Sequence, residues 1–409
     1  MRIDEAAVLE AAETGATDVA DLLERAARGG TPLYDPRTCR ATFLWRARPE
    51  VQAVHLRVNR VTEKDDFERG LMRRVGQTGW WIRTLELAPT LRASYGFVEY
   101  TDPAEARPLI PGEGMPPVLA DPHGAGPVIP YEPVAPAASA GRPGARPAVR
   151  TGHSVFSGPL APAAPEWDGP VPSTPATHHP EAVHPAATTG ASAIEPDGEI
   201  AGVPLFRHHP GSRPEARLLL FDAEDWFLRL DLPRALAVAG LDVEVIGVGH
   251  RDRETRMRTL RGNTDFLTAV LDATVADKDP AVPLIVAGQS LGGLSALLAL
   301  LERPGAVDAV IAQSPSVWWW PGRACSPRDL DAHRVDWLAA RFTAAEPQTA
   351  RVVLGVGTRE GLMLPKTHTL AHVMAARGWD ARVRVWDGGH DLACWRHDLI
   401  DALLEVLDQ

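Results

Sequence analysis

Hydrophobic residues in the second half of the chain fall into short runs that alternate with stretches of helical spacing. The short runs, which we predict to be strands, lie at residues 216–222, 241–249, 283–288, 306–314, 351–358 and 381–389. The stretches with helical spacing lie at residues 232–240, 263–277, 294–303, 368–378 and 397–408. Strands that alternate with helices in this way are typical of a mostly parallel sheet with helices on both faces. We therefore predict an α/β fold for residues 199–409.

The first part of the chain has a different pattern. Residues 1–30 are rich in alanine, and their larger hydrophobic residues have roughly helical spacing, which predicts a short helical region. Four apolar and aromatic runs follow: ATFLWRA, VQAVHLRVN, GWWIRTLEL and ASYGFVEY. Several of them alternate apolar and polar positions, as half-buried strands do. We predict a small β-sandwich over residues 31–123.

Between these two regions the composition changes to proline, alanine, glycine and serine. Residues 124–198 contain stretches such as PVAPAASAGRPGARPAV, which can bury little apolar surface. Compositions of this kind are typical of linkers. The expected order is a helical region, a β-sandwich domain, a linker insertion and an α/β domain.

Composition narrows the functional classes. The 409-residue chain has a formal net charge of −11, which argues against generic binding to nucleic acids or anionic membranes. Its three cysteines, Cys39, Cys325 and Cys394, are far apart, so they indicate neither a disulfide framework nor a metal site. The N-terminus has no signal-peptide pattern, and no apolar stretch is long enough to span a membrane. We expect a cytoplasmic protein.

One short motif indicates nucleophilic chemistry. The sequence Gly288-Gln289-Ser290-Leu291-Gly292 follows a predicted strand and precedes a predicted helix, which is the setting of a nucleophile elbow. The glycines let neighbouring backbone pass close to the turn, and the helix N-terminus places partial positive charge near a developing oxyanion. The alternative is a glycine-rich packing turn whose serine caps the helix. We predict that Ser290 is a nucleophile.

A serine nucleophile needs a base and an acid. His390 lies between a predicted strand and the last helix, where α/β-hydrolases place their histidine. Glu360 follows a strand and lies between Ser290 and His390 in chain order. Asp387 and Asp391 flank the histidine and remain alternatives. The base would take the serine proton, and the acid would fix the tautomer of the imidazole.

At these residues the chain resembles a known family. LLLFDAEDW, VAGQSLGGLSALLALLERP, AQSPSVWWWPG, GTREGLML and DGGHDLACWR are similar to segments of the enterochelin (ferric enterobactin) esterases. FLWR, GWWIR, ASYGFVEY and LADPHG resemble the N-terminal domain of those enzymes. The resemblance covers nearly the whole chain except residues 124–198. It implies an esterase D-like domain of the α/β-hydrolase type behind an early-set β-sandwich.

The resemblance also assigns residues. Ser290 matches the nucleophile of the family, His390 the base, and Glu360 an acidic position that follows an arginine in a turn. Arg256 matches an arginine that would face anionic catecholates. The aromatic wall of the family corresponds to three tryptophans, Trp318, Trp319 and Trp320. Guanidinium and indole faces suit an anionic complex with flat rings, although we expect at least one tryptophan to be core packing only.

Two positions in the expected site depart from the family pattern. We expect the oxyanion hole to use the backbone N–H groups of Leu291 and of the Asp222–Ala223 loop. The family usually has glycine where this chain has Ala223, and alanine would narrow the hole if that position required positive φ. The family usually has glutamate where this chain has Thr259, which removes a carboxylate that could orient Arg256. The identity of the siderophore is therefore left open.

Cytoplasmic members of this family hydrolyse the triserine lactone of iron-loaded tricatecholate siderophores, so that the iron is easier to reduce and release. We expect the same serine esterase activity here, on an enterobactin-like ferric siderophore. No cofactor and no protein metal site are expected, because the iron arrives with the substrate. The alternatives are an esterase or acyltransferase on another acyl substrate in natural-product metabolism, and a non-catalytic catecholate-binding protein. The oligomeric state is left open.

Overall fold

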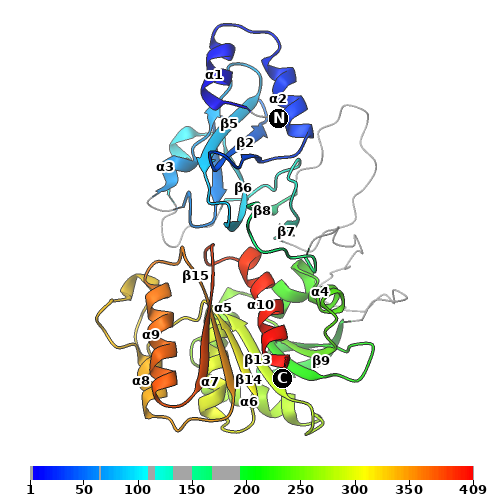
Figure 1. The fold of residues 1–409 in the computed structure, drawn as a ribbon, viewed down its shortest axis with the longest axis vertical. Coiled ribbons are helices and arrows are strands. Elements are labelled where there is room, and N and C mark those ends of the chain that lie inside the picture. Colours follow the sequence, from blue (N-terminus) through cyan, green and yellow to red (C-terminus); the bar gives the residue numbers. More distant parts are fainter. Residues whose placement is uncertain (1–2, 64–65, 109–115, 132–149, 168–193, 409) are drawn as a thin grey trace. The chain divides into compact units, whose positions relative to one another are not determined.

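The computed structural model describes residues 3–63, 66–108, 116–131, 150–167 and 194–408, which form two compact units (Figure 1). The N-terminal unit contains Met1–Ala163 together with the short segment Asp387–Ala393. The C-terminal unit contains Ala164–Trp167, Thr177–Trp386 and Cys394–Gln409. The segment that carries His390 therefore belongs to the N-terminal unit, although it connects a strand and a helix of the C-terminal unit.

The N-terminal unit begins with helices α1 (Glu5–Glu13) and α2 (Val19–Arg28), and its strands form two antiparallel sheets. One sheet has the order β1 (Leu33–Asp35), β2 (Arg40–Arg46), β5 (Trp80–Glu86), β4 (Arg73–Arg74). The other has the order β3 (Ala53–Val58), β6 (Arg92–Tyr100), β8 (Gly152–Ser157), β7 (Val128–Pro130). The short helices are α3 (Phe67–Gly70) and η2 (Pro103–Glu105). Trp45 of β2 stacks on Phe97 of β6, with ring centroids 4.4 Å apart, so aromatic side chains fill the space between the two sheets.

Three strands begin within residues 124–198, which the composition predicts to be a linker. Strands β7 and β8 complete the second sheet, and β9 (Ile194–Ile200) is an edge strand of the C-terminal unit. The linker prediction is therefore wrong for these strands. The reason is that β8, of sequence GHSVFS, pairs with β6 and buries Val155 and Phe156 between proline-rich flanks. Residues 132–149 and 168–193 of the predicted linker lie outside the described residues.

The C-terminal unit is built on an eight-stranded sheet with the order β16-β15-β14-β13-β11-β12-β10-β9. Its further strands are β10 (Val203–His208), β11 (Ala216–Phe221), β12 (Val243–Val248), β13 (Leu284–Gln289), β14 (Ala309–Gln313), β15 (Arg351–Gly357) and β16 (Asp380–Trp386). Strands β11 to β16 pair in parallel, whereas β10 is antiparallel to both of its neighbours. This architecture confirms the predicted mostly parallel sheet.

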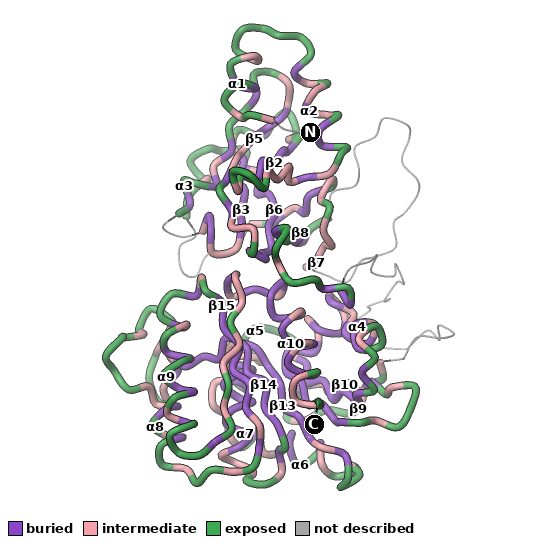
Figure 2. Tube along the Cα trace, in the orientation of Figure 1, coloured by how far each residue is buried: buried purple, intermediate pink, exposed green. Residues whose placement is uncertain are grey.

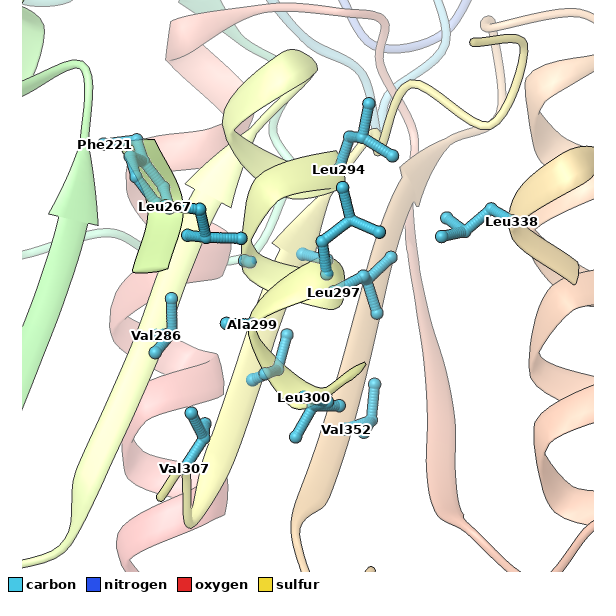
Figure 3. Close-up of a cluster of buried hydrophobic side chains, with 14 of the residues drawn as sticks. Phe221, Leu267, Val286, Leu294, Leu297, Ala299, Leu300, Val307, Leu338 and Val352 are labelled. Atoms are coloured by element: carbon cyan, nitrogen blue, oxygen red, sulfur yellow. The ribbon is translucent and has the colours of Figure 1, made fainter. Parts of the chain in front are cut away.

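Helices of the C-terminal unit cover the sheet. They are α4 (Leu232–Ala239), α5 (Arg253–Leu260), α6 (Thr264–Val275), α7 (Leu291–Glu302), α8 (Trp337–Ala344), α9 (Met363–Ala376) and α10 (Leu392–Leu407), with the short helices η3 (Glu224–Arg229) and η4 (Pro327–Asp329). Figure 3 shows α7 in front of the strands, with α10 behind them. None of the described helices is long and apolar enough to cross a membrane.

The core of the C-terminal unit explains its continuous hydrophobic runs. Every residue of β11, β12 and β13 is buried, because these strands are covered on both faces (Figure 2). Helix α7 is buried from Leu291 to Leu300 and packs against β13 and β14. Its leucines meet Phe221, Leu267 and Leu338 in one cluster (Figure 3). The strand ends at which the site is expected are thus held by a rigid core.

The order of the strands predicts where a ligand would bind. From β11 the chain moves to β12 on one side, and it then returns to β13 on the other side of β11. Open α/β sheets bind ligands at the carboxyl ends of the strands beside such a reversal. Asp222 follows β11 and Ser290 follows β13, so both lie at this position.

Candidate active site

Ser290 has the backbone geometry of a nucleophile elbow. It links β13 to α7 with φ 58° and ψ −115°, a conformation that costs energy for a residue with a Cβ atom. Its N–H donates to the carbonyl oxygen of Gln313 at 2.9 Å, which fixes the turn against the end of β14. The Ser290 side chain makes no capping hydrogen bond to α7. The alternative role of Ser290 as a helix cap is therefore not supported.

The glycines around Ser290 are required by close backbone contacts. A Cβ atom on Gly288 would lie 2.5 Å from the carbonyl carbon of Gly292. A Cβ atom on Gly293 would lie 3.1 Å from the carbonyl oxygen of Gly288 and 3.2 Å from that of Gln313. The first turn of α7 thus packs directly on the end of β13, as the motif predicts.

The expected oxyanion donors lie beside this turn. Leu291 is the first residue of α7, where backbone N–H groups have no acceptor within the helix. Ala223 follows Asp222 and has φ −55°, an ordinary conformation for any residue. Positive φ occurs instead at Asp222, with φ 62°. Alanine at position 223 is therefore not strained, and the concern that it would narrow the hole does not apply.

Asp222 joins Arg256 to the elbow. Its carboxylate accepts hydrogen bonds from Nε and Nη2 of Arg256 at 2.5 and 2.8 Å, and from Nε2 of Gln289 at 3.0 Å. The Oε1 atom of Gln289 in turn accepts from Nε1 of Trp226 at 3.2 Å. Asp222 thus supplies the carboxylate that the family pattern would place at Thr259. Sequence reasoning missed this pairing because the partners are far apart in the chain.

Two further titratable groups border this cluster. Burial lowers the pKa of His250 to about 4, which outweighs the attraction of the Asp222 carboxylate 3.4 Å away. Burial also raises the pKa of Glu224 to about 7, although its carboxylate accepts a hydrogen bond from the backbone N–H of His250. Sequence reasoning did not single out either residue. The one signal was that each follows the end of a predicted strand.

Glu360 is buried at the carboxyl end of β15. Its Oε1 atom accepts hydrogen bonds from the hydroxyl of Ser314 at 2.7 Å and from the N–H of Gly357 at 2.8 Å. The carboxylate is thus fixed by the ends of two neighbouring strands, β14 and β15.

The His390 segment makes its described hydrogen bonds within the N-terminal unit. The carbonyl oxygen of His390 accepts from Nδ2 of Asn59 at 3.3 Å. The side chain of Asp387 accepts from the hydroxyl of Thr90 at 2.6 Å. Asp391 accepts from the N–H groups of Ser94 at 2.6 Å and of Ala393 at 3.0 Å, and burial raises its pKa. The two aspartates considered as alternative acids therefore hold the segment and the start of α10.

The three tryptophans have different environments. Trp319 is buried, meets Trp337 edge to face at a centroid distance of 4.9 Å, and packs on Gly262. Trp320 lies beneath the guanidinium groups of Arg323 and Arg334, each 4.5 Å from the ring centroid. Trp318 and Trp320 line a hollow of about 160 Å³ together with Arg323, Cys325, Arg334 and Asp336. Core packing is thus confirmed for one tryptophan, and sequence reasoning missed the two arginines.

The structure therefore brings together Ser290, Leu291, Ala223 and Arg256 at the reversal of strand order. Glu360 and the tryptophan run follow the neighbouring strands β15 and β14 of the same sheet. His390 lies in the segment that belongs to the N-terminal unit. Among the described residues, no group of three or more His, Cys, Asp or Glu side chains could hold a metal ion.

Comparisons with known proteins agree with this architecture. The family "Putative esterase" matches residues 209–406, and "Enterochelin esterase, N-terminal" matches residues 40–167. An iron(III) salmochelin esterase from Escherichia coli O6:H1 is 28% identical over 88% of this chain and 86% of its own length. An iron(III) enterobactin esterase from Escherichia coli K12 is 34% identical over 44% of this chain and 43% of its own length.

The chain is similar to enterochelin esterases over most of its length. A crystal structure of the ferric enterobactin esterase from Salmonella typhimurium has the same fold, with a TM-score of 0.69 and 23% identity. The match between the two structures covers 95% of this chain and 100% of the Salmonella typhimurium chain. An enterobactin esterase from Shigella flexneri, crystallised in the presence of enterobactin, gives a TM-score of 0.64 with 22% identity and covers 90% and 92% of the two chains. Both regions of this chain thus have counterparts in enterochelin esterases.

Proposed function

We propose that this protein is a serine esterase that hydrolyses the trilactone backbone of an iron-loaded, enterobactin-like catecholate siderophore. The observation that carries the proposal is the strained turn at Ser290, which lies at the reversal of strand order. The hydroxyl of Ser290 does not cap α7. The relative that covers most of this chain is named for hydrolysis of a ferric siderophore of this kind, which supports the choice of substrate.

The proposed chemistry is acyl transfer to serine and then to water. His390 takes the proton of Ser290 as Oγ attacks a lactone carbonyl, and Glu360 stabilises the imidazolium that forms. The N–H groups of Leu291 and Ala223 donate to the oxyanion of the tetrahedral intermediate. Collapse breaks the ester C–O bond, and the imidazolium protonates the leaving alkoxide. Water, deprotonated by His390, then releases the acyl group and regenerates Ser290.

Arg256 and the half-buried side chains of Trp318 and Trp320 are the proposed contacts for the catecholate rings. Asp222 uses Nε and Nη2 of Arg256, so Nη1 is the nitrogen proposed to donate to an anionic oxygen. The iron is part of the substrate, and no resident cofactor is proposed. We place the reaction in the cytoplasm, in keeping with the three free cysteines.

The decisive experiment is chromatography of an iron-loaded enterobactin-type trilactone after incubation with the protein. The wild type should convert it to linear and shorter acyl-serine products, and Ser290→Ala should lower the rate by at least about 10³-fold. Ser295→Ala, which removes a buried serine hydroxyl from α7, is the control and should retain activity.

Two other results would each replace the proposal. Hydrolysis of simple aryl esters without any cleavage of the trilactone would favour an esterase or acyltransferase on another acyl substrate. Tight binding of the ferric complex, seen as quenching of tryptophan fluorescence, without Ser290-dependent hydrolysis would favour a binding protein.

A further inference from the structure

Ser314 occupies a strained and fully buried position directly after β14. It has φ 45°, in the left-handed region that a residue with a Cβ atom adopts at a cost. Its N–H donates to the carbonyl oxygen of Gly355 in β15 at 2.7 Å. Strain of this kind persists only where surrounding structure holds it, and it is concentrated at functional sites.

The hydroxyl of Ser314 has two partners that fix its direction. An indole nitrogen can only donate, so the 2.9 Å bond from Nε1 of Trp395 makes the Ser314 oxygen an acceptor. The proton of the same hydroxyl is then directed to Oε1 of Glu360 at 2.7 Å. Glu360, Ser314 and Trp395 form a chain of two hydrogen bonds. Trp395 lies on α10, five residues after His390 in the sequence.

The residue before Ser314 has a matching role toward the nucleophile. The carbonyl oxygen of Gln313 accepts the N–H of Ser290 at 2.9 Å, and Nε2 of Gln313 donates to the carbonyl oxygen of Trp395 at 2.8 Å. The dipeptide Gln313-Ser314 thus contacts both the proposed nucleophile and the proposed acid. A change in its position would move both at once.

We propose that Ser314 is a positioning residue that aligns the carboxylate of Glu360 for its partnership with His390. This inference rests on the proposed function, since it assigns Glu360 the part of the triad acid. Ser314 itself touches neither substrate nor reacting atoms. It acts by holding Oε1, together with the N–H of Gly357, so that the plane of the carboxylate is fixed.

The test uses two substitutions at Ser314. Ser314→Ala removes the hydroxyl but keeps the strain, whereas Ser314→Gly removes both, because glycine adopts positive φ without cost. Both variants should lower kcat about 10–100-fold and change KM less than about threefold. The acid limb of the kcat/KM profile should move to lower pH, because a poorly aligned carboxylate stabilises positive charge on the base less well.

A matched control and a double variant complete the experiment. Ser316 is equally buried, and its hydroxyl has no hydrogen-bond partner among the described residues, so Ser316→Ala should leave kcat and the pH profile unchanged. In a Glu360→Gln background, Ser314→Gly should cost less than about twofold, because its effect passes through Glu360. Thermal unfolding of each variant separates loss of fold from loss of alignment.

The outcomes separate this role from the proposed function. If Ser314→Gly hydrolyses a p-nitrophenyl ester or the trilactone at the wild-type rate, and this hydrolysis depends on Ser290, then the role of Ser314 alone is overturned. The role of Ser314 is also overturned if the reductions in kcat caused by Ser314→Gly and by Glu360→Gln multiply in the double variant. If the wild type shows no Ser290-dependent hydrolysis of either ester, the proposed function fails, and the role of Ser314 fails with it.

Discussion

Gly288 shows how tightly the turn before Ser290 is packed. A Cβ atom there would meet backbone atoms of Gly292, which cannot rotate away as a flexible side chain could. Gly288→Ala should therefore displace the elbow, lower kcat by at least about 100-fold and destabilise the protein by about 1–3 kcal/mol. Enzyme kinetics and thermal unfolding would measure the two effects.

A suitable control for this substitution lies in the same unit. Gly211 has no atom within 4 Å of a Cβ position and needs no positive φ, so Gly211→Ala should be nearly neutral. Equal activity of the two glycine variants would contradict the close packing assigned to the elbow.

The sequence predicted Ser290 and its glycines because their spacing is local and the chemistry demands those residue types. It could not predict that Asp222 pairs with Arg256, since a contact over 34 positions leaves no mark in a single sequence. Nor could it show that Ala223 has ordinary φ and that Asp222 takes the strained conformation.

Asp222, which follows β11, joins Arg256 of α5 to Gln289 at the carboxyl end of β13. Arg256→Lys keeps the positive charge but loses the paired bonds to Asp222, so the charge would no longer be fixed in direction. KM for the anionic ferric trilactone should rise about tenfold, whereas KM for a neutral p-nitrophenyl ester should change little. Steady-state kinetics on both substrates would measure this.

Arg258 offers the comparison for that variant. It is exposed on the same helix, and its described hydrogen bond, to the carbonyl oxygen of Ala201, is long at 3.5 Å. Arg258→Lys should leave both KM values unchanged. An equal rise in KM for the neutral ester would show that Arg256 supports the fold and does not recognise charge.

Element boundaries were predictable where a cap marks them. Asn263, at the start of the predicted helical stretch 263–277, caps α6, and its side chain accepts from the N–H of Phe266. Helix α10 begins at Leu392, five residues before the start expected from periodicity, because Asp391 accepts the N–H of Ala393. Strand β8 was missed because its pairing with β6 is a tertiary interaction that composition does not reveal.

The pH dependence of stability should reflect buried neutral histidines. Burial lowers the pKa of His55 to about 4 in the N-terminal unit, where its ring stacks on Phe67. The unfolded chain therefore binds a proton below about pH 6.5 that the folded chain binds only near pH 4, and stability falls as pH falls through this window. His55→Gln should remove up to about 2 kcal/mol of the loss between pH 7 and pH 5.

Thermal unfolding of the wild type and of His55→Gln at several pH values would test this expectation. The midpoint of the variant should decline less steeply below pH 6.5. In the C-terminal unit, by contrast, His250 and Glu224 act in opposite directions, because the raised pKa of Glu224 costs stability as pH rises toward about 7. Parallel declines for the wild type and His55→Gln would rule out the contribution of His55.

The two-part organisation of the chain was predictable from the change in periodicity and from the proline-rich stretch. The path of the chain was not. Seven residues from Asp387 to Ala393 group with the N-terminal unit, and long-range hydrogen bonds join them to it. A boundary drawn along the sequence places His390 in the α/β domain, whereas the contacts of its segment lie with the N-terminal unit.

Because the His390 segment is held by the N-terminal unit, the β-sandwich cannot be removed without loss of the partners of this segment. A shortened gene product that begins at residue 199 would keep strands β10 to β16 of the large sheet. It would lose Asn59, Thr90 and Ser94, the anchors of the histidine loop, together with most of β9. Exchange of esterase regions between relatives would likewise separate the histidine loop from the residues that hold it. The two halves are therefore expected to be inherited, expressed and engineered as one piece.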